Sequence, residues 1–182
     1  MHIFVYNSIG DNMYWLNSFF LYSIIGYIME IAVGFLVGAN NPESGILYGP
    51  WTLIYGFSSI IIILISEKLF KKIHLNVFLE TIIVFLIIIV VLMVIECLGG
   101  YLIELVFGFS FWDYTDFRFN LGKYTCFEMG IVWGILGILF IYVLKPFFDI
   151  FINKIPKTVT FLLIILVIID LIIRLFKEFS VF

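Results

Sequence analysis

Charged residues are scarce in this sequence. They make up 13% of its 182 residues, about half the share that a soluble domain carries. Ten residues are Lys or Arg and the formal net charge is -3, so the sequence lacks the basic surface that a nucleic-acid-binding protein needs. Nucleic acid is therefore excluded as a main partner.

Cysteine is scarcer still, with Cys97 and Cys126 as its two copies. Both lie in apolar surroundings, and their spacing provides neither a disulfide framework nor a metal site. The two histidines, His2 and His74, are not part of a metal-ligand pattern in the sequence either. We therefore expect free thiols and predict neither a cofactor nor a metal site.

The sequence also lacks a Gly-rich loop followed by Lys and Ser or Thr. Such a loop holds the phosphates of ATP in P-loop enzymes, so this chain cannot hydrolyse ATP by that route. Any ATP drive would need a partner chain, and no catalytic constellation is recognisable in the sequence.

Hydrophobic side chains, in contrast, are abundant. They make up 64% of the residues, aromatic ones 20%, and the mean hydropathy is +1.20. A soluble domain of this length could not bury so much apolar surface. The composition therefore predicts a membrane protein, with membrane lipids as its surroundings.

A membrane-spanning helix needs about 20 apolar residues. Five segments of suitable length predict an all-α, polytopic transmembrane helical bundle, a single integral membrane domain over residues 1–182. The predicted spans are residues 14–37, 47–65, 77–98, 124–144 and 159–176. The distribution of Lys and Arg between the short loops favours a cytoplasmic N-terminus.

Glycine and proline interrupt this pattern. The second span begins with Tyr48-Gly49-Pro50-Trp51 and carries Gly56, which predicts irregular backbone and a broken or re-entrant span. The third span is predicted to end at Gly99-Gly100, followed by a short interfacial helix over residues 101–107 and a structured aromatic loop. In the fourth span, three glycines on nearly one face, Gly130, Gly134 and Gly137, predict close approach of another backbone.

Acidic residues inside predicted spans are the informative ones, because a charge at the bilayer centre costs about 2.5 to 3.5 kcal/mol. Glu30, Glu96, Glu128 and Asp170 are such residues. We expect Glu30 and Glu96 to face a common polar interior, with a hydrogen-bonding group from another segment within reach of at least one. Alternatively, each carboxyl group is protonated or clasps helices together. Asp170 lies one helical turn before Arg174, so the two can pair.

The aromatic loop carries Asp113, Arg118 and Asn120 among Trp, Tyr and Phe residues. Arg118 offers a planar donor fork to a carboxylate of the protein or of a ligand. The alternative is an interfacial aromatic belt with snorkelling basic groups. We expect the loop to fold back over the bundle.

The order of several motifs carries a family resemblance. These are Gly26-Tyr27-Ile28-Met29-Glu30, Gly45-Ile46-Leu47-Tyr48-Gly49-Pro50, Ile54-Tyr55-Gly56-Phe57, Glu96, Trp112-Asp113-Tyr114, Phe119-Asn120 and Trp133-Gly134. Over roughly residues 19–146 the sequence resembles the ABC-transporter type IV family, the CmpB-like bacterial integral membrane proteins. Ser44 stands where many relatives carry Arg, and Leu53 where Pro is expected.

The resemblance implies a permease-like transporter component in the bacterial cytoplasmic (inner) membrane. It favours Glu30, Tyr55, Glu96, Asp113 and Asn120 as site residues. A homo-oligomer, or a partner membrane or ATPase subunit, is also expected, because a chain of this size makes a small pore alone.

Three functions remain open. The first is a permease-like protein that binds or translocates a small polar or cationic solute in a cavity lined by carboxylates and aromatics. Its expected substrate-binding residues are Glu30, Tyr55, Glu96, Asp113, Arg118 and Asn120. The second is an intramembrane enzyme for a lipid or lipid-linked substrate, with Glu30 or Glu96 as general base. The third is a non-catalytic membrane scaffold or regulatory subunit.

Overall fold

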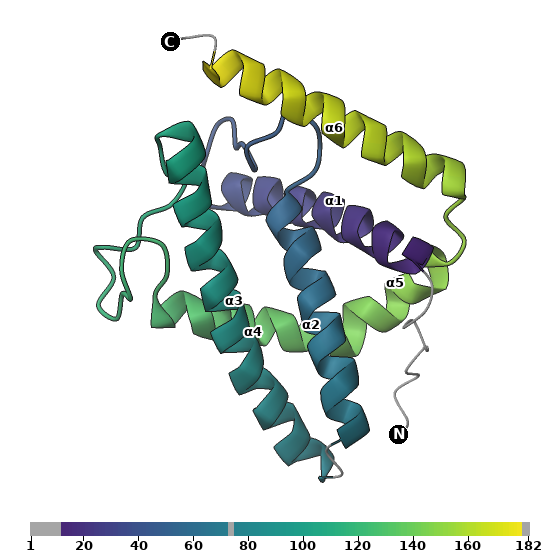
Figure 1. The fold of residues 1–182 in the computed structure, drawn as a ribbon. Helices are drawn as coiled ribbons and strands as arrows, with labels where there is room; N and C mark the ends of the chain where they lie inside the picture. Colours follow the sequence, from purple (N-terminus) through teal and green to yellow (C-terminus); the bar gives the residue numbers. More distant parts are fainter. Residues whose placement is uncertain (1–11, 73–74, 180–182) are drawn as a thin grey trace. The chain divides into compact units, whose positions relative to one another are not determined.

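The chain folds into helices joined by irregular segments (Figure 1). The computed structural model describes residues 12–72 and 75–179, with residues 70–72 described by their backbone only. The helices are α1 (Asn12–Leu36), α2 (Leu53–Lys72), α3 (Val77–Phe107), α4 (Phe127–Leu139), the π-helix η1 (Phe140–Leu144), α5 (Lys145–Ile152) and α6 (Lys157–Phe179). Within the described ranges no strand forms, and the predicted all-α fold is confirmed.

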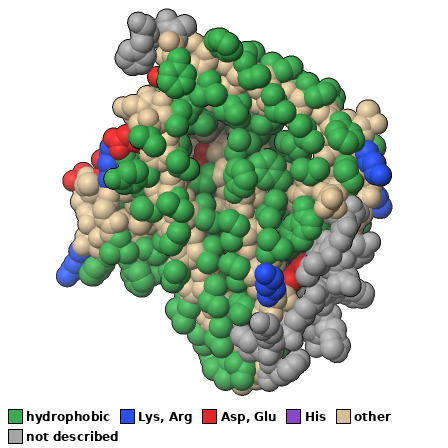
Figure 2. Space-filling view, in the orientation of Figure 1, with side chains coloured by type: hydrophobic (Ala, Val, Ile, Leu, Met, Phe, Trp, Pro, Cys, Tyr) green, Lys and Arg blue, Asp and Glu red, His purple; other side chains and the backbone are tan. Residues whose placement is uncertain are grey.

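Four helical stretches are long and apolar enough to cross a membrane. They are α1, α3, the continuous stretch Phe127–Ile152 and α6. Hydrophobic side chains cover much of the face shown in Figure 2, and outward-facing residues such as Leu36 and Leu105 suit contact with lipid. The chain is thus a multi-pass membrane protein. The fifth predicted span corresponds to α2, whose last side chains lie outside the described residues, so its crossing of the membrane stays a prediction.

The chain divides into two compact units. One comprises residues 1–60 and 149–182, and the other residues 61–148. Glu30 belongs to the first unit and Glu96 to the second. A single integral membrane domain over residues 1–182 remains a prediction.

In the first unit, polar side chains join α1 to the end of α5 and the start of α6. Asn17 Nδ2 donates to the carbonyl oxygen of Ile152 at 3.1 Å, and Asn17 Oδ1 accepts from Thr160 Oγ1 at 2.5 Å. Tyr14 OH donates to Asp149 Oδ1 at 2.8 Å. These bonds satisfy polar groups away from water, which is a requirement for stable helix packing in a membrane.

The predicted break in the second span is confirmed. Helix α2 begins only at Leu53, so the stretch from Tyr48 to Gly56 is not one continuous helix. Pro50 has no N–H to donate to a helix, and the glycines at positions 45 and 49 weaken one further. Gly45 adopts a left-handed φ of 70° that a residue with Cβ would avoid.

In the second unit, α3 is longer than predicted. It runs without a break through Gly99-Gly100 to Phe107, so the expected end of the span at residue 98 and the separate helix over residues 101–107 are wrong. A glycine costs a helix only about 1 kcal/mol, which tertiary packing can outweigh. The helix ends instead at Gly108, which has a φ of 72° and donates its N–H to the Glu104 carbonyl oxygen.

The glycines of α4 allow close packing on α3, as predicted. A Cβ atom built on Gly134 would lie 2.6 Å from the Phe85 ring, and one on Gly137 would lie 2.5 Å from Ile88. A Cβ atom built on Gly130 would likewise lie too close to the side chain of Met93. The absence of side chains at these positions therefore brings the two helices together.

The fourth span also continues further than predicted, beyond residue 144 to Ile152. Its helix widens into the π-helix η1, where the N–H of Lys145 donates to the Phe140 carbonyl oxygen. Pro146 follows at once, and a proline ring would clash with the carbonyl four residues earlier in a regular helix. The wider turn accommodates the ring, so the helix passes through the proline instead of ending before it.

Candidate functional site

The best-defined polar cluster surrounds Glu96 on α3. Its side-chain carboxylate accepts three hydrogen bonds, from Tyr114 OH to Oε1 at 2.9 Å, from Trp133 Nε1 to Oε1 at 3.0 Å and from Thr125 Oγ1 to Oε2 at 3.2 Å. Glu96 is 7% exposed. All three donors are neutral, and no Lys or Arg of the described part lies within ion-pair distance of this carboxylate.

The aromatic loop over residues 109–126 positions two of these donors. The loop doubles back on itself, with the N–H of Tyr114 donating to the Lys123 carbonyl oxygen at 2.8 Å. Trp112 Nε1 donates to the carbonyl oxygen of Tyr124 at 3.0 Å. The predicted folding back of the loop is therefore confirmed, because Tyr114 and Thr125 reach Glu96 from it.

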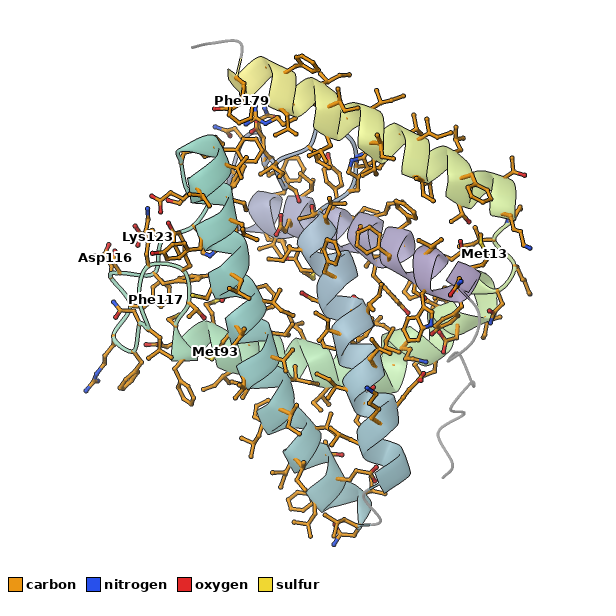
Figure 3. All side chains as sticks on the ribbon, in the orientation of Figure 1. Met13, Met93, Asp116, Phe117, Lys123 and Phe179 are labelled. Atoms are coloured by element: carbon orange, nitrogen blue, oxygen red, sulfur yellow. The ribbon has the colours of Figure 1, made fainter. Side chains whose placement is uncertain are left out.

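Two further contacts fix the loop to the helices on either side. Lys123 Nζ lies 2.6 Å from Glu104 Oε1 on α3. The N–H of Phe119 donates to Glu128 Oε1, in the first turn of α4, at 3.1 Å. Figure 3 labels Asp116, Phe117 and Lys123 on this loop, which lies alongside α3. Because α3 is continuous, Glu96 and Glu104 lie on the same face of one helix.

The second cluster surrounds Glu30 on α1. Glu30 Oε1 accepts from Tyr55 OH at 2.8 Å, and Glu30 Oε2 accepts from Ser44 Oγ at 2.5 Å. Ser44 Oγ also lies 2.5 Å from Thr52 Oγ1. Since Ser44 has one hydroxyl proton and donates it to Glu30, Thr52 is the donor of that second bond. Tyr55 reaches this position because Gly26 leaves no Cβ in its way.

These two clusters confirm that the intramembrane glutamates meet hydrogen-bonding groups from other segments. Glu30 and its partners belong to the first unit, and Glu96 and its partners to the second. A polar interior shared by both glutamates stays a prediction. An open groove of about 240 Å³ beside α3 and α4 is lined by none of the predicted site residues; its lining is Thr81, Ile82, Phe85, Ile135 and Ile138.

Asp170 on α6 forms the third cluster. Its carboxylate accepts from the N–H groups of Tyr48 and Gly49 at 3.0 and 2.8 Å and from Trp51 Nε1 at 2.9 Å. Sequence spacing predicts a pair with Arg174, whereas the partners of Asp170 are these donors and Arg174 lies 3.5 Å from Glu178. The N–H groups of Tyr48 and Gly49, which have no helical partner in the broken span, are thus hydrogen-bonded by the protein. This is needed because the hydrocarbon of a bilayer offers no hydrogen-bond partner.

The other predicted site residues stay within the loop. Asp113 Oδ1 accepts from Thr115, from its N–H at 2.9 Å and its hydroxyl at 2.7 Å. Asn120 Nδ2 donates to the Thr115 carbonyl oxygen at 2.5 Å. Arg118 is exposed and lies over the Phe119 ring, 5.3 Å from its centroid. These contacts make Asp113 and Asn120 part of the turn and Arg118 part of the aromatic surface.

The pKa values outside the spans agree with these roles. Hydrogen bonds from Thr115, first from its hydroxyl and then from its N–H, hold the pKa of Asp113 below its ordinary value. Burial raises the pKa of the Cys126 thiol, and the negative charges of Glu128 and Glu96 raise it further. Cys126 is 0% exposed, so this thiol is a helix cap and no nucleophile.

Sequence reasoning missed several members of these clusters. Tyr114, Thr125 and Trp133 surround Glu96, while Ser44 and Thr52 complete the Glu30 cluster. Tyr114 and Trp133 belong to motifs of the family resemblance, and that was the available signal. Thr125 and Thr52 carry no signal of their own, because a threonine outside a helix is ordinary. Among the described residues, no group of three His, Cys, Asp or Glu side chains is placed to hold a metal ion.

The chain matches a known protein family. A family model described as Putative ABC-transporter type IV matches residues 17–177, most of the chain. The match extends beyond the region of resemblance to include α6 and Asp170. No curated protein and no solved structure matches the chain.

Proposed function

We propose that this chain, which belongs to the ABC-transporter type IV family, is a permease-like membrane subunit. Its ligand is a small polar or cationic solute. The binding group in the second unit is the carboxylate of Glu96, with Tyr114 and Trp133 beside it. The carboxylate of Glu30, with Tyr55 beside it, is a separate candidate binding group in the first unit.

The observation that carries the proposal is the lack of a countercharge at Glu96. Glu96 lies in the middle part of an apolar helix and is bonded only to neutral donors among the described residues. An anion in such a place is costly, so it is usually paired or functional. A solute cation supplies the missing charge, and N–H groups of a solute supply further hydrogen bonds to the carboxylate.

The surroundings of Glu96 fit such a solute. Tyr114 and Trp133 place two aromatic side chains beside the carboxylate. The faces of these rings attract cations, while their O–H and N–H groups orient the carboxylate. Glu30 has a comparable set in Tyr55 and Ser44, again with hydroxyl donors, and no basic residue of the described part is bonded to it.

Energy for transport has to come from elsewhere, because the sequence contains no P-loop motif. The family name fits a partner ATPase or a second membrane subunit. We propose such a partner, in the bacterial cytoplasmic membrane, for this chain.

A thermal-stability screen tests the proposal. The full chain in lipid nanodiscs is heated with choline, putrescine or arginine, and with uncharged analogues of similar size. A solute at 100 times its Kd raises the free energy of unfolding by about 2.7 kcal/mol, and we expect at least one cation to raise the Tm. Glu96→Gln abolishes the increase that arises at Glu96, whereas Glu104→Gln, on the same helix as Glu96, keeps it. Glu30→Gln tests the separate Glu30 group in the same way. Equal responses of the wild type and both site variants to every cation contradict the proposal.

A scaffold or regulatory subunit is the second candidate, and Asp170 favours it. Asp170 holds residues 48–51 through three hydrogen bonds, which is the behaviour of a carboxylate that only clasps segments. If Glu30 and Glu96 act in the same way, their Gln variants lower thermal stability and alter no solute response.

A further inference from the structure

Glu96 and Asp170 have the same exposure but different kinds of donors. Each is 7% exposed and accepts three hydrogen bonds. The donors to Asp170 are two backbone N–H groups and one indole N–H, which can donate but never accept. They occupy both carboxylate oxygens. None of these three donors could accept a hydrogen bond from a carboxyl O–H.

The bonds around Glu96 allow both the ionised and the protonated form. Oε1 accepts from Tyr114 and Trp133, while Oε2 meets, among the residues that the structure describes, only the hydroxyl of Thr125. When Oε2 carries a proton, Oε1 becomes a carbonyl oxygen, whose two lone pairs keep both of its bonds. The new O–H then donates to Thr125 Oγ1, because a hydroxyl can accept as well as donate. Only the Thr125 proton has to turn, and no bond to Glu96 is lost.

The charged and titratable groups on the surrounding elements do not fix Glu96 in its ionised form. On α3, Glu104 is paired with Lys123 of the loop. The loop contributes the Tyr114 hydroxyl, and the start of α4 contributes Cys126 and the carboxylate of Glu128, which is bonded to Phe119. Among the described residues, no cation is bonded to Glu96.

We infer that Glu96 is a proton-binding site, where a proton and the cationic solute compete for one carboxylate. The inference rests on the proposed function and adds to it the proton that the solute displaces. The protonated side chain releases H⁺ and becomes a carboxylate when the solute cation arrives, so the charge of the site is unchanged. The released proton passes to the aqueous solution. Thr125 turns its hydroxyl back toward Oε2 in the same step.

Infrared difference spectra between acid and alkaline pH test this inference on the full chain in nanodiscs. A protonated carboxyl group has a C=O band that a carboxylate lacks. We expect a wild-type band that Glu96→Gln removes and Glu104→Gln retains. Tyr114→Phe removes one of two hydrogen bonds to the C=O oxygen, so the band moves to higher wavenumber. Tyr101→Phe is the matched control. Tyr101 lies on the same helix as Glu96 and is 68% exposed, so this variant leaves the band in place.

The outcomes separate this inference from the proposed function. Identical spectra for the wild type and Glu96→Gln, over the pH range in which both stay folded, overturn proton binding at Glu96 even if cations raise the Tm. A Glu96 band without any cation response supports the proton site and overturns solute binding. If Glu96→Gln does not fold, an unshifted band in folded Tyr114→Phe contradicts the assignment to Glu96.

Discussion

The carboxylate of Asp170 accepts a hydrogen bond from the indole Nε1 of Trp51 at 2.9 Å, joining residues that are 119 positions apart in the sequence. The same carboxylate accepts the N–H groups of Tyr48 and Gly49. One side chain of α6 thereby replaces the helical hydrogen bonds that the broken span lacks. The segment that carries Ser44 and Thr52 toward Glu30 follows the same fixed path.

Asp170→Asn is expected to destabilise the protein. The amide NH₂ of Asn cannot accept, so at least one of the three N–H donors is left without a partner. A buried donor stranded in this way costs about 1 to 3 kcal/mol. Glu178→Gln is the control on α6, because its ion pair with Arg174 is partly exposed and such pairs contribute about 0 to 1 kcal/mol. Thermal unfolding in nanodiscs measures both, and equal Tm values for the two variants would count against the Asp170 cluster.

Gly100→Ala is expected to loosen the contact between α3 and the aromatic loop. A Cβ atom at residue 100 would lie 2.5 Å from the ring of Tyr124 and 2.8 Å from its Cβ, so the side chain cannot simply swing away. Overpacking of this kind costs about 1 to 3 kcal/mol. Leu98→Ala, at a position that is 58% exposed, is the control and stays near the wild-type stability. An increase in Tm for Gly100→Ala would mean that this contact is open.

Much of the fold could be predicted from the sequence, because hydropathy alone marks the spans. The ends of the helices could not. Gly99-Gly100 reads as a stop, yet α3 continues because Tyr124 packs against the bare backbone of Gly100. Pro146 reads as a stop for the fourth span, and the π-helix before it removes the clash. Both outcomes depend on packing that lies outside the local sequence.

The acidic members of the candidate site could also be predicted, because a carboxylate inside a span is expensive. Their partners could not be predicted, since Thr125 and Ser44 come from loops whose paths the sequence leaves open. For Asp170 the helical spacing predicts Arg174, while the backbone N–H donors that it binds carry no sequence signal at all.

The loop turn at Asp113 is expected to depend on pH. Because its folded-state pKa is lowered, the ionised carboxylate stabilises the turn above its ordinary pKa. This contribution is lost as the pH falls through the lowered value. Thr115→Val removes the hydroxyl donor, so the pKa of Asp113 rises toward its ordinary value. Thr115→Ser keeps that donor and the lowered pKa. An NMR titration of the Asp113 carboxyl carbon measures the change, and identical curves for Val and Ser would exclude the hydroxyl as its cause.

Arg118 decides whether the aromatic loop belongs to the site or only covers it. Its side chain is exposed, and its contact is the Phe119 ring at 5.3 Å. An exposed cation–π contact contributes about 0.5 to 1 kcal/mol. We therefore expect Arg118→Ala and Arg118→Lys to change the free energy of unfolding by no more than about 1 kcal/mol.

Combining each of two variants with Glu96→Gln gives the decisive comparison. Trp133 donates directly to Glu96, so Trp133→Phe and Glu96→Gln should couple by about 0.5 to 3 kcal/mol. Arg118→Ala and Glu96→Gln share no contact among the described residues and should add within about 0.5 kcal/mol. Strong coupling of Arg118 to Glu96 would show that the guanidinium group belongs to the site. Removing a buried partner of a carboxylate costs about 3 to 5 kcal/mol. Additive effects leave Arg118 on the aromatic surface and assign the orientation of Glu96 to Tyr114, Thr125 and Trp133.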